Sequence, residues 1–268
     1  MNKHAVSAFF RKLGLIRFSD TLRFYLAWIK TYPARKKFLA SHENLALPPA
    51  YYLYETFNLN YHSFYNESRK TAQWLIDHFN HFTDTNHANI LDWGCGPGRI
   101  IRHLRDTLPS TASLSGTDYN EKYIKWCRKH IQGVRFKTNE LDPPMNFEND
   151  HFDIIFGISI FTHLSATNHY AWFDELIRVT KPGGIIFLTL HGTAFRKMLS
   201  QPEKEVFNKG EIVIQSGTKE GHRTYGAFHP EKFVRRLIGK NLILEHIPGE
   251  VTNDRPQQDV WIIRKAMQ

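Results

Sequence analysis

The chain has 268 residues, of which 41% are hydrophobic and 14% aromatic. This composition predicts a folded globule, because disordered segments are poor in aromatic residues. The two cysteines, Cys95 and Cys127, lie outside any repeated Cys/His spacing, which excludes a zinc-binding or disulfide scaffold, and no metal is expected. No signal-peptide pattern and no stretch near the roughly 20 apolar residues of a membrane span is present, so we expect a cytoplasmic protein.

The positive charge is concentrated in the first 50 residues. They carry 9 Lys/Arg against 2 Asp/Glu, while the formal net charge of the whole chain is +9. Apolar residues recur there at spacings of three and four, which predicts a basic amphipathic helical arm over 1–50; they are Phe9, Phe10, Leu13, Ile16, Leu22, Tyr25, Leu26 and Ile29. We favour a lid on the domain for this arm, with peripheral contact to an anionic membrane surface as the alternative.

Residues 51–268 alternate strand-like apolar runs with helical patterns. Strands are expected at 89–92, 113–118, 134–138, 152–158 and 185–191. This alternation predicts an α/β fold with a Rossmann-like, doubly wound and mostly parallel sheet. Two late runs, at 242–247 and 260–263, predict an antiparallel edge that completes seven strands. The polar stretch 196–229 is expected to be an insertion in this domain.

The strongest motif is a glycine-rich turn after the first predicted strand. Asp92 precedes three glycines at alternate positions, Gly94, Gly96 and Gly98. Glycine permits positive φ and lets a ligand lie against bare backbone. The Gly-x-Gly-x-Gly spacing differs from the Gly-x-Gly-x-x-Gly of dinucleotide sites, and a nearby acid disfavours a pyrophosphate but can hold an ammonium. The motif therefore favours a nucleoside that bears an amino acid.

A second acid, Asp118, ends the next predicted strand. A carboxylate at this position can accept hydrogen bonds from both hydroxyls of a ribose. The alternative is a turn-forming Asp before Asn120, because Asp and Asn favour turns and helix caps.

In this order and spacing the motifs resemble those of class I S-adenosylmethionine-dependent methyltransferases. The resemblance covers roughly residues 89–191 and includes the strand 152–156 and the run Arg178 to Gly184. It implies S-adenosylmethionine as cofactor, with the glycine loop and Asp92 on the methionine part, Asp118 on the ribose and residues 139–141 on the adenine edge. The implied cofactor-binding residues are Asp92, Trp93, Gly94, Cys95, Gly96, Gly98, Asp118, Tyr119, Asn139, Glu140, Leu141, Ile158 and Ser159.

The methyl acceptor is expected to be a small molecule or glycan, methylated on oxygen. The segments 159–164 and 171–176 are similar to a bacterial methyltransferase subgroup associated with polysaccharide and lipid-linked sugar modification. An RNA or protein methyltransferase is the alternative enzyme, although the near-neutral charge after residue 50 argues against nucleic acid. The remaining alternative is an interaction module that binds the cofactor without catalysis.

Two histidines are candidate general bases. His163 follows the fourth predicted strand and His191 ends the fifth, at the sheet edge where ligands bind in such folds. Packing or helix capping is the alternative for each. Tyr225 and His229 lie where they could close over the site, but loop packing is expected for both.

Asp142, Pro143, Pro144 and Met145 are similar to a signature of methyltransferases that act on exocyclic amines of bases. That signature follows the fourth strand, whereas this run precedes it. Met145 also lacks the aromatic ring that would stack on a flipped base. We therefore expect a proline-stiffened loop.

Overall fold

The computed structural model describes residues 16–267, except for the side chains of residues 16–20 and 56. The chain forms two compact units, Met1–Ala72 and Gln73–Gln268, which are described separately. Phe9, Phe10 and Leu13 of the predicted arm lie outside the described residues. The predicted domain limits at residue 50 and at 196–229 stay predictions.

The described part of the first unit is helical. Its elements are α2 (Ile16–Lys30), α3 (Tyr32–Ala40), α4 (Ala50–Phe57) and the π-helical turn η1 (Ser63–Glu67), and α5 (Ser68–Phe82) continues into the second unit. Pro33 stands in the first turn of α3, where its missing N–H costs nothing. Phe38, Leu53 and Phe64 are buried in the core of this unit, and Phe24 and Ala27 of α2 pack against them.

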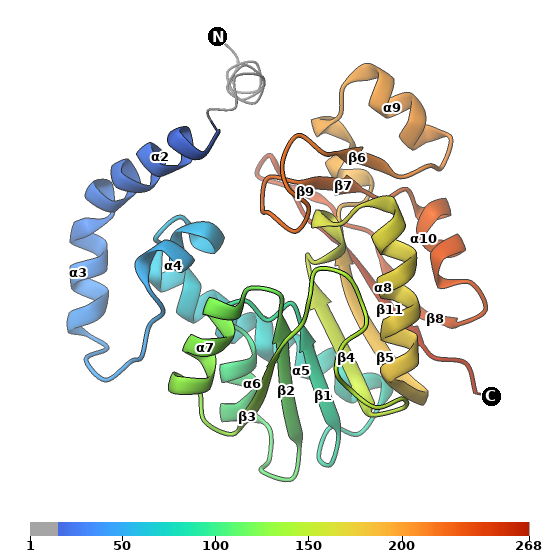
Figure 1. Cartoon of the computed structure of the whole chain (residues 1–268), viewed down its shortest axis with the longest axis horizontal. Coiled ribbons are helices and arrows are strands. Elements are labelled where there is room, and N and C mark those ends of the chain that lie inside the picture. The colour runs from blue at the N-terminus through green and yellow to red at the C-terminus, as the bar shows by residue number, and fades with distance from the viewer. Residues whose placement is uncertain (1–15, 268) are drawn as a thin grey trace. The chain divides into compact units, whose positions relative to one another are not determined.

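The second unit is built on a seven-stranded sheet (Figure 1). Its strands are β1 (Asn89–Trp93), β2 (Ser113–Asp118), β3 (Val134–Thr138), β4 (Phe152–Ile158), β5 (Thr180–Leu190), β8 (Leu242–Ile247) and β11 (Asp259–Arg264), in the order β3-β2-β1-β4-β5-β11-β8. Strands β1 to β5 pair in parallel, and β11 runs antiparallel between β5 and β8. The predicted Rossmann-like sheet with an antiparallel edge is confirmed.

Helices cover both faces of this sheet. They are α5, α6 (Ile101–Thr107), α7 (Glu121–His130), α8 (Ala166–Val179) and α10 (Glu231–Ile238). Phe79 of α5 packs its ring on Phe156 and Phe187. The neighbouring Ile186 belongs instead to the cluster that contains Trp172 of α8. Because successive strand residues point to opposite faces, α5 and α8 lie on opposite sides of the sheet.

The short helical turn η2 (Phe161–His163) lies between β4 and α8, and further short elements come after β5. They are η3 (Thr193–Met198), α9 (Gln201–Asn208), and the antiparallel pairs β6 (Val213–Gln215) with β7 (Gly226–Phe228) and β9 (Val251–Thr252) with β10 (Arg255–Pro256). A serine with a glutamate three residues later starts α9, and the two side chains of this pair, Ser200 and Glu203, form a capping box.

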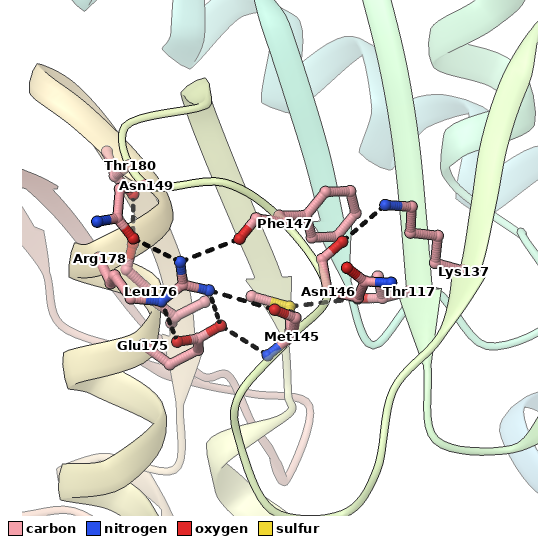
Figure 2. Close-up of polar contacts among 10 residues, drawn as sticks. All are labelled: Thr117, Lys137, Met145, Asn146, Phe147, Asn149, Glu175, Leu176, Arg178 and Thr180. Carbon is pink, nitrogen blue, oxygen red and sulfur yellow. Dashed lines mark hydrogen bonds and ion pairs between the residues drawn. The ribbon is translucent and has the colours of Figure 1, made fainter.

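The connection between β3 and β4 contains no helix and is held by ion-paired side chains of α8 (Figure 2). Arg178 donates to both carboxylate oxygens of Glu175, each at 2.7 Å. Arg178 also donates to the carbonyls of Phe147 and Met145, and Glu175 accepts the N–H of Met145 at 2.6 Å. The Met145 side chain is buried in the core, so the proline-containing run is a packed loop, as its composition predicts.

Removing Arg178 is expected to destabilise this loop. Glu175 is 5% exposed, so Arg178→Ala leaves a buried carboxylate without its cation, and we expect a loss of about 3 kcal/mol in the free energy of unfolding. The matched control is Lys125→Ala, which breaks an exposed ion pair with Glu121 and should cost much less than Arg178→Ala. Urea denaturation of both variants checks this, and equal losses would contradict it.

Candidate functional site

The glycine loop turns at the carboxyl ends of β1 and β2, where Asp118 holds it. One oxygen of the Asp118 carboxylate accepts the N–H of Gly96 at 2.9 Å, and the other accepts the N–H of Asn120 at 2.8 Å. Asp118 is therefore both a loop anchor and the turn-forming residue that the alternative interpretation expects. The Asp118 carboxylate therefore lies against the backbone of the glycine loop, at the carboxyl end of β2.

The three glycines of the loop differ in what surrounds them. All three have positive φ. A Cβ on Gly94 would lie 2.2 Å from the Ile160 side chain, and one on Gly98 would lie 2.4 Å from the Ile131 side chain. A Cβ on Gly96 would meet no atom within 4 Å. Gly94 and Gly98 therefore permit close packing inside the protein, whereas Gly96 leaves open space against its backbone, the kind of space into which a ligand fits.

Asp92 is a buried acid beside this loop, 3% exposed at the end of β1. Burial raises its pKa to about 8, Arg99 opposes the rise and Asp118 adds to it. A carboxylate that is costly to ionise in the protein alone is stabilised by a cationic ligand. Asp92 thus suits the ammonium that the sequence motif predicts.

The other residues of the glycine turn contribute little through their side chains. The ring of Trp93 packs on Phe161 and Trp172 in the hydrophobic core. The thiol of Cys95 is buried and lies 3.6 Å from the Gly96 carbonyl. The side chains of Trp93 and Cys95 are thus packed inside the protein, and the Cys95 N–H donates to the Thr117 carbonyl at 2.8 Å.

The predicted adenine edge follows β3. The side-chain Nδ2 of Asn139 donates to the Glu140 carbonyl at 2.6 Å. The buried Oδ1 of the same side chain has no partner among the described residues. Leu141 is half-buried, and its carbonyl accepts the Trp172 Nε1–H at 2.8 Å. The Asn139 Oδ1 is as buried as the Nδ1 of His191, so a ligand donor does not reach it in this conformation, and the adenine assignment of this turn stays a prediction.

Ser159 lies just beyond β4, next to Ile158, which is half-buried at the strand's end. Its φ is 65°, a value that non-glycine residues rarely adopt. The Ser159 N–H bonds Thr189 Oγ1 at 2.9 Å, and its hydroxyl accepts from Gln258 Nε2 at 2.7 Å. Backbone strain held by surrounding bonds is common at functional sites.

The loop between β6 and β7, residues 216–225, reaches the predicted cofactor residues. Tyr119 donates its hydroxyl to the Gly221 carbonyl at 3.0 Å, and a Cβ on Gly221 would lie 2.9 Å from Leu141. Glu220 of the same loop accepts the N–H of Ser165 at 2.6 Å and the side-chain amide of Asn168 at 2.9 Å. The β6–β7 loop thus joins the adenine edge to the start of α8.

His163 is held by the middle and by the last residue of the β6–β7 loop. Its carbonyl accepts the Gly221 N–H at 2.9 Å, and its Nδ1 lies 3.0 Å from the Tyr225 carbonyl. Since a carbonyl can only accept, Nδ1 carries the proton and Nε2 offers its lone pair. Burial lowers the pKa of His163, the Tyr225 carbonyl opposes this and His222 adds to it. His163 is therefore a neutral, oriented imidazole at neutral pH.

His191 is a poorer base than His163. Its ring stacks on Phe195 with centroids 4.0 Å apart, and its Nδ1 is buried without a partner among the described residues. Burial lowers its pKa to about 4, His163 adds to this, and the Ala227 carbonyl opposes it. His191 is confined by packing, so a substrate proton cannot reach its unpaired nitrogen in this conformation.

His229 packs as its loop position predicts. It is 1% exposed, and its Nε2 lies 2.8 Å from the Nε2 of His169. His169 donates from Nδ1 to the Ser165 carbonyl, so His229 must donate to His169. No group of His, Cys, Asp and Glu side chains within residues 16–267 is arranged to bind a metal ion.

Three residues near the site are not among the residues predicted from the sequence. Arg99 acts electrostatically on Asp92, Gln258 bonds Ser159, and Glu220 ties the β6–β7 loop to α8. Arg99 directly follows the glycine motif and was within reach of sequence reasoning. Glu220 and Gln258 come from segments distant in the sequence, so only the fold brings them to the site.

Comparison with known proteins agrees with this geometry. Residues 90–184, which hold the glycine loop, Asp118 and strands β1 to β4, match the family model described as Methyltransferase domain. The chain contains a class I methyltransferase domain. This domain has the strand order of Figure 1 and the predicted fold class.

The relatives of the methyltransferase domain act on different substrates. A tRNA N(3)-methylcytidine methyltransferase of Schizosaccharomyces pombe is 24% identical over 149 residues, 53% of this chain and 48% of that protein. The chain therefore spans about half the length of that relative. A ubiquinone biosynthesis O-methyltransferase of Rickettsia bellii is 23% identical over 186 residues, 68% of this chain and 72% of that protein.

A solved structure shares the fold over nearly the whole chain. Magnesium protoporphyrin IX methyltransferase from Synechocystis, determined with bound SAH, has a TM-score of 0.55 and 14% identity, and the match covers 99% of this chain and 100% of that one. At 14% identity, this similarity shows a shared fold.

The open space at Gly96 gives a direct test of the cofactor position. Gly96→Ala is expected to weaken S-adenosylmethionine binding at least about tenfold, because the new methyl group points into that space, and to cost about 1–2 kcal/mol of stability for the left-handed backbone. Gly183→Ala is the matched control, with φ +77° and only the Met267 sulfur, at 3.1 Å, near its Cβ. Calorimetric titration should show weakened binding in Gly96→Ala alone, and unchanged binding there would contradict the assignment.

Proposed function

We propose that the chain is an S-adenosylmethionine-dependent methyltransferase that methylates an oxygen of a small molecule or glycan. The observation that carries the cofactor is the glycine loop anchored on Asp118, with open space at Gly96. One further group fits the same ligand. Burial raises the pKa of Asp92, and a cationic group of a ligand beside it would favour its ionised form.

These residues divide the cofactor between them. Asp92 and the loop backbone hold the methionine part, Asp118 accepts ribose hydroxyls, and the turn at 139–141 lies along the adenine edge. The bound cofactor supplies an electrophilic methyl group on a sulfonium. Transfer from a sulfonium depends mainly on alignment, so the chief task of the protein is to orient the acceptor oxygen toward that methyl group.

His163 removes the acceptor proton in this proposal. The Tyr225 carbonyl holds the Nδ1 proton, which leaves Nε2 free to accept a proton from a hydroxyl. The lowered pKa of His163 keeps the imidazole neutral at physiological pH. A base of this kind is useful for a hydroxyl acceptor, because a hydroxyl must lose its proton as it gains the methyl group.

A tRNA methyltransferase is the second candidate, since a tRNA-modifying enzyme is among the relatives. The charge distribution argues against it. Residues 51–268 carry 26 Lys/Arg against 24 Asp/Glu, which is little excess for a surface that follows a polyanion. The remaining alternative is an interaction module that binds the cofactor without catalysis. The presence of both acids and all three loop glycines argues against it, because a decayed site would be expected to lack one of them.

Calorimetric titration with S-adenosylmethionine, its demethylated product and NAD tests the cofactor. Micromolar binding of the first two, without binding of NAD, is the expected result. Asp118→Ala should weaken binding by about 2–3 kcal/mol, because it removes charge-assisted bonds to the ribose. Asp118→Asn, which keeps the shape of the side chain, should lose less. NAD binding, or unchanged affinity in both variants, would contradict the proposed site.

The pH dependence of methyl transfer tests the role of His163. A neutral base acts above its pKa, so the acid limb of kcat should lie below pH 6.5, the ordinary value for histidine, because burial lowers this pKa. His163→Gln should lower kcat by about 100-fold or more and leave cofactor affinity within about twofold. His191→Gln is the control, and its pH profile should keep the acid limb of the unchanged protein. An unchanged acid limb in His163→Gln would exclude His163 as the base.

A further inference from the structure

Helix α2 presents an apolar face that its own unit does not cover. Leu22, Tyr25, Leu26 and Ile29, which we call the α2 face, are 53%, 59%, 59% and 72% exposed. Their spacing of three and four residues places them on one side of a helix. Phe24 and Ala27, which pack into the core of the unit, lie on the other side.

The orientation of the α2 face is fixed by contacts between α2 and α3. The Arg35 guanidinium lies 3.6 Å from the centre of the Trp28 ring and donates to the Trp28 carbonyl at 2.7 Å. Arg35 also bonds the Thr31 hydroxyl at 3.1 Å. Because α2 is held on one side by its core and by Arg35, the opposite face cannot be covered by a rotation of the helix about its axis.

The charges around the α2 face have one sign. Arg23 and Lys30 are exposed, seven residues apart, and so lie along one flank of the face. Residues 21–42 carry five Lys/Arg and no Asp or Glu. Trp28 and Tyr32, 39% and 57% exposed, lie on the other flank, and such side chains favour a membrane interface.

We propose that the α2 face docks on an anionic lipid surface and lies in its plane. The Leu and Ile side chains would enter the hydrocarbon boundary while the flanking cations contact phosphate headgroups. No helix among the described residues is long and apolar enough to cross a bilayer, so the contact is peripheral to the lipid core. This proposal does not depend on the proposed methyltransferase activity.

Charge and chemistry disfavour three other partners for the α2 face: a second copy of the chain, the rest of the chain, and a nucleic acid. A second copy would bring another arm with 9 Lys/Arg against 2 Asp/Glu, and the two arms would repel. Residues 51–268 have 26 Lys/Arg against 24 Asp/Glu and offer no negative excess. Nucleic acid would match the cations but leaves exposed Leu and Ile side chains without an apolar partner.

A single-site fluorescent label tests the contact directly. Both native cysteines are buried, so Ile29→Cys can be labelled selectively with a polarity-sensitive thiol dye on the full chain. Leu242→Cys, at a position 57% exposed on β8, is the matched control. The dye at position 29 should have water-like emission in buffer and shift to the blue with phosphatidylcholine vesicles that contain phosphatidylglycerol, and the dye at 242 should not shift.

Unlabelled variants test which forces act in vesicle flotation. Vesicles with phosphatidylglycerol should bind at least about tenfold more tightly than pure phosphatidylcholine, and salt should weaken this preference. Leu26→Gln with Ile29→Gln should weaken binding at least about tenfold, because two side chains lose their burial. Leu242→Gln with Val251→Gln, at positions 57% and 50% exposed in the other unit, should have no effect. Arg23→Gln with Lys30→Gln should abolish most of the anionic preference.

Other outcomes would overturn the proposal. A blue-shifted dye at position 29 in buffer alone would mean that the methyltransferase domain or a second copy covers the face. A shift with tRNA and none with vesicles would assign the arm to nucleic acid. Vesicle binding that is unchanged by the Leu26→Gln and Ile29→Gln substitutions would place the lipid contact elsewhere.

Discussion

The hydrogen bond from the Gly96 N–H to the Asp118 carboxylate is the constraint on which the site depends, at 2.9 Å. It joins the loop after β1 to the end of β2 and so fixes the open backbone at Gly96 beside an acid. The strand order turns back between β1 and β4, which is where ligands bind in open α/β sheets. One carboxylate therefore shapes the loop at the position where we propose that the cofactor binds.

The β6–β7 loop extends this constraint to the acceptor side. It contacts Tyr119 and Leu141 at the adenine edge, and it holds His163 at both the backbone and the imidazole. Cofactor seating and the orientation of the proposed base thus share one loop. The structure gives His163 a defined tautomer through a bond to a carbonyl, while His191 is confined by aromatic rings.

The two units use their apolar residues differently. The methyltransferase domain buries large side chains such as Trp172 and Trp261 on one face of its sheet. The first unit has a small core, and the outer face of α2 stays exposed beside most of the excess positive charge of the chain. Apolar exposure and positive charge on the same short segment suit attachment to a surface, whereas the chemistry belongs to the other unit.

The sequence by itself determined the sheet, because buried strands and amphipathic helices follow from local periodicity, and the strands at 113–118, 134–138 and 152–158 have the predicted bounds. It also pointed to the glycine loop as the proposed cofactor site, since Asp92, Gly96 and Asp118 carry a local pattern. Only the tertiary structure decided that Glu220 and Gln258 reach the site and that His163 rather than His191 has an available nitrogen. Those properties depend on contacts between distant segments, and such contacts leave no periodic signal in the chain.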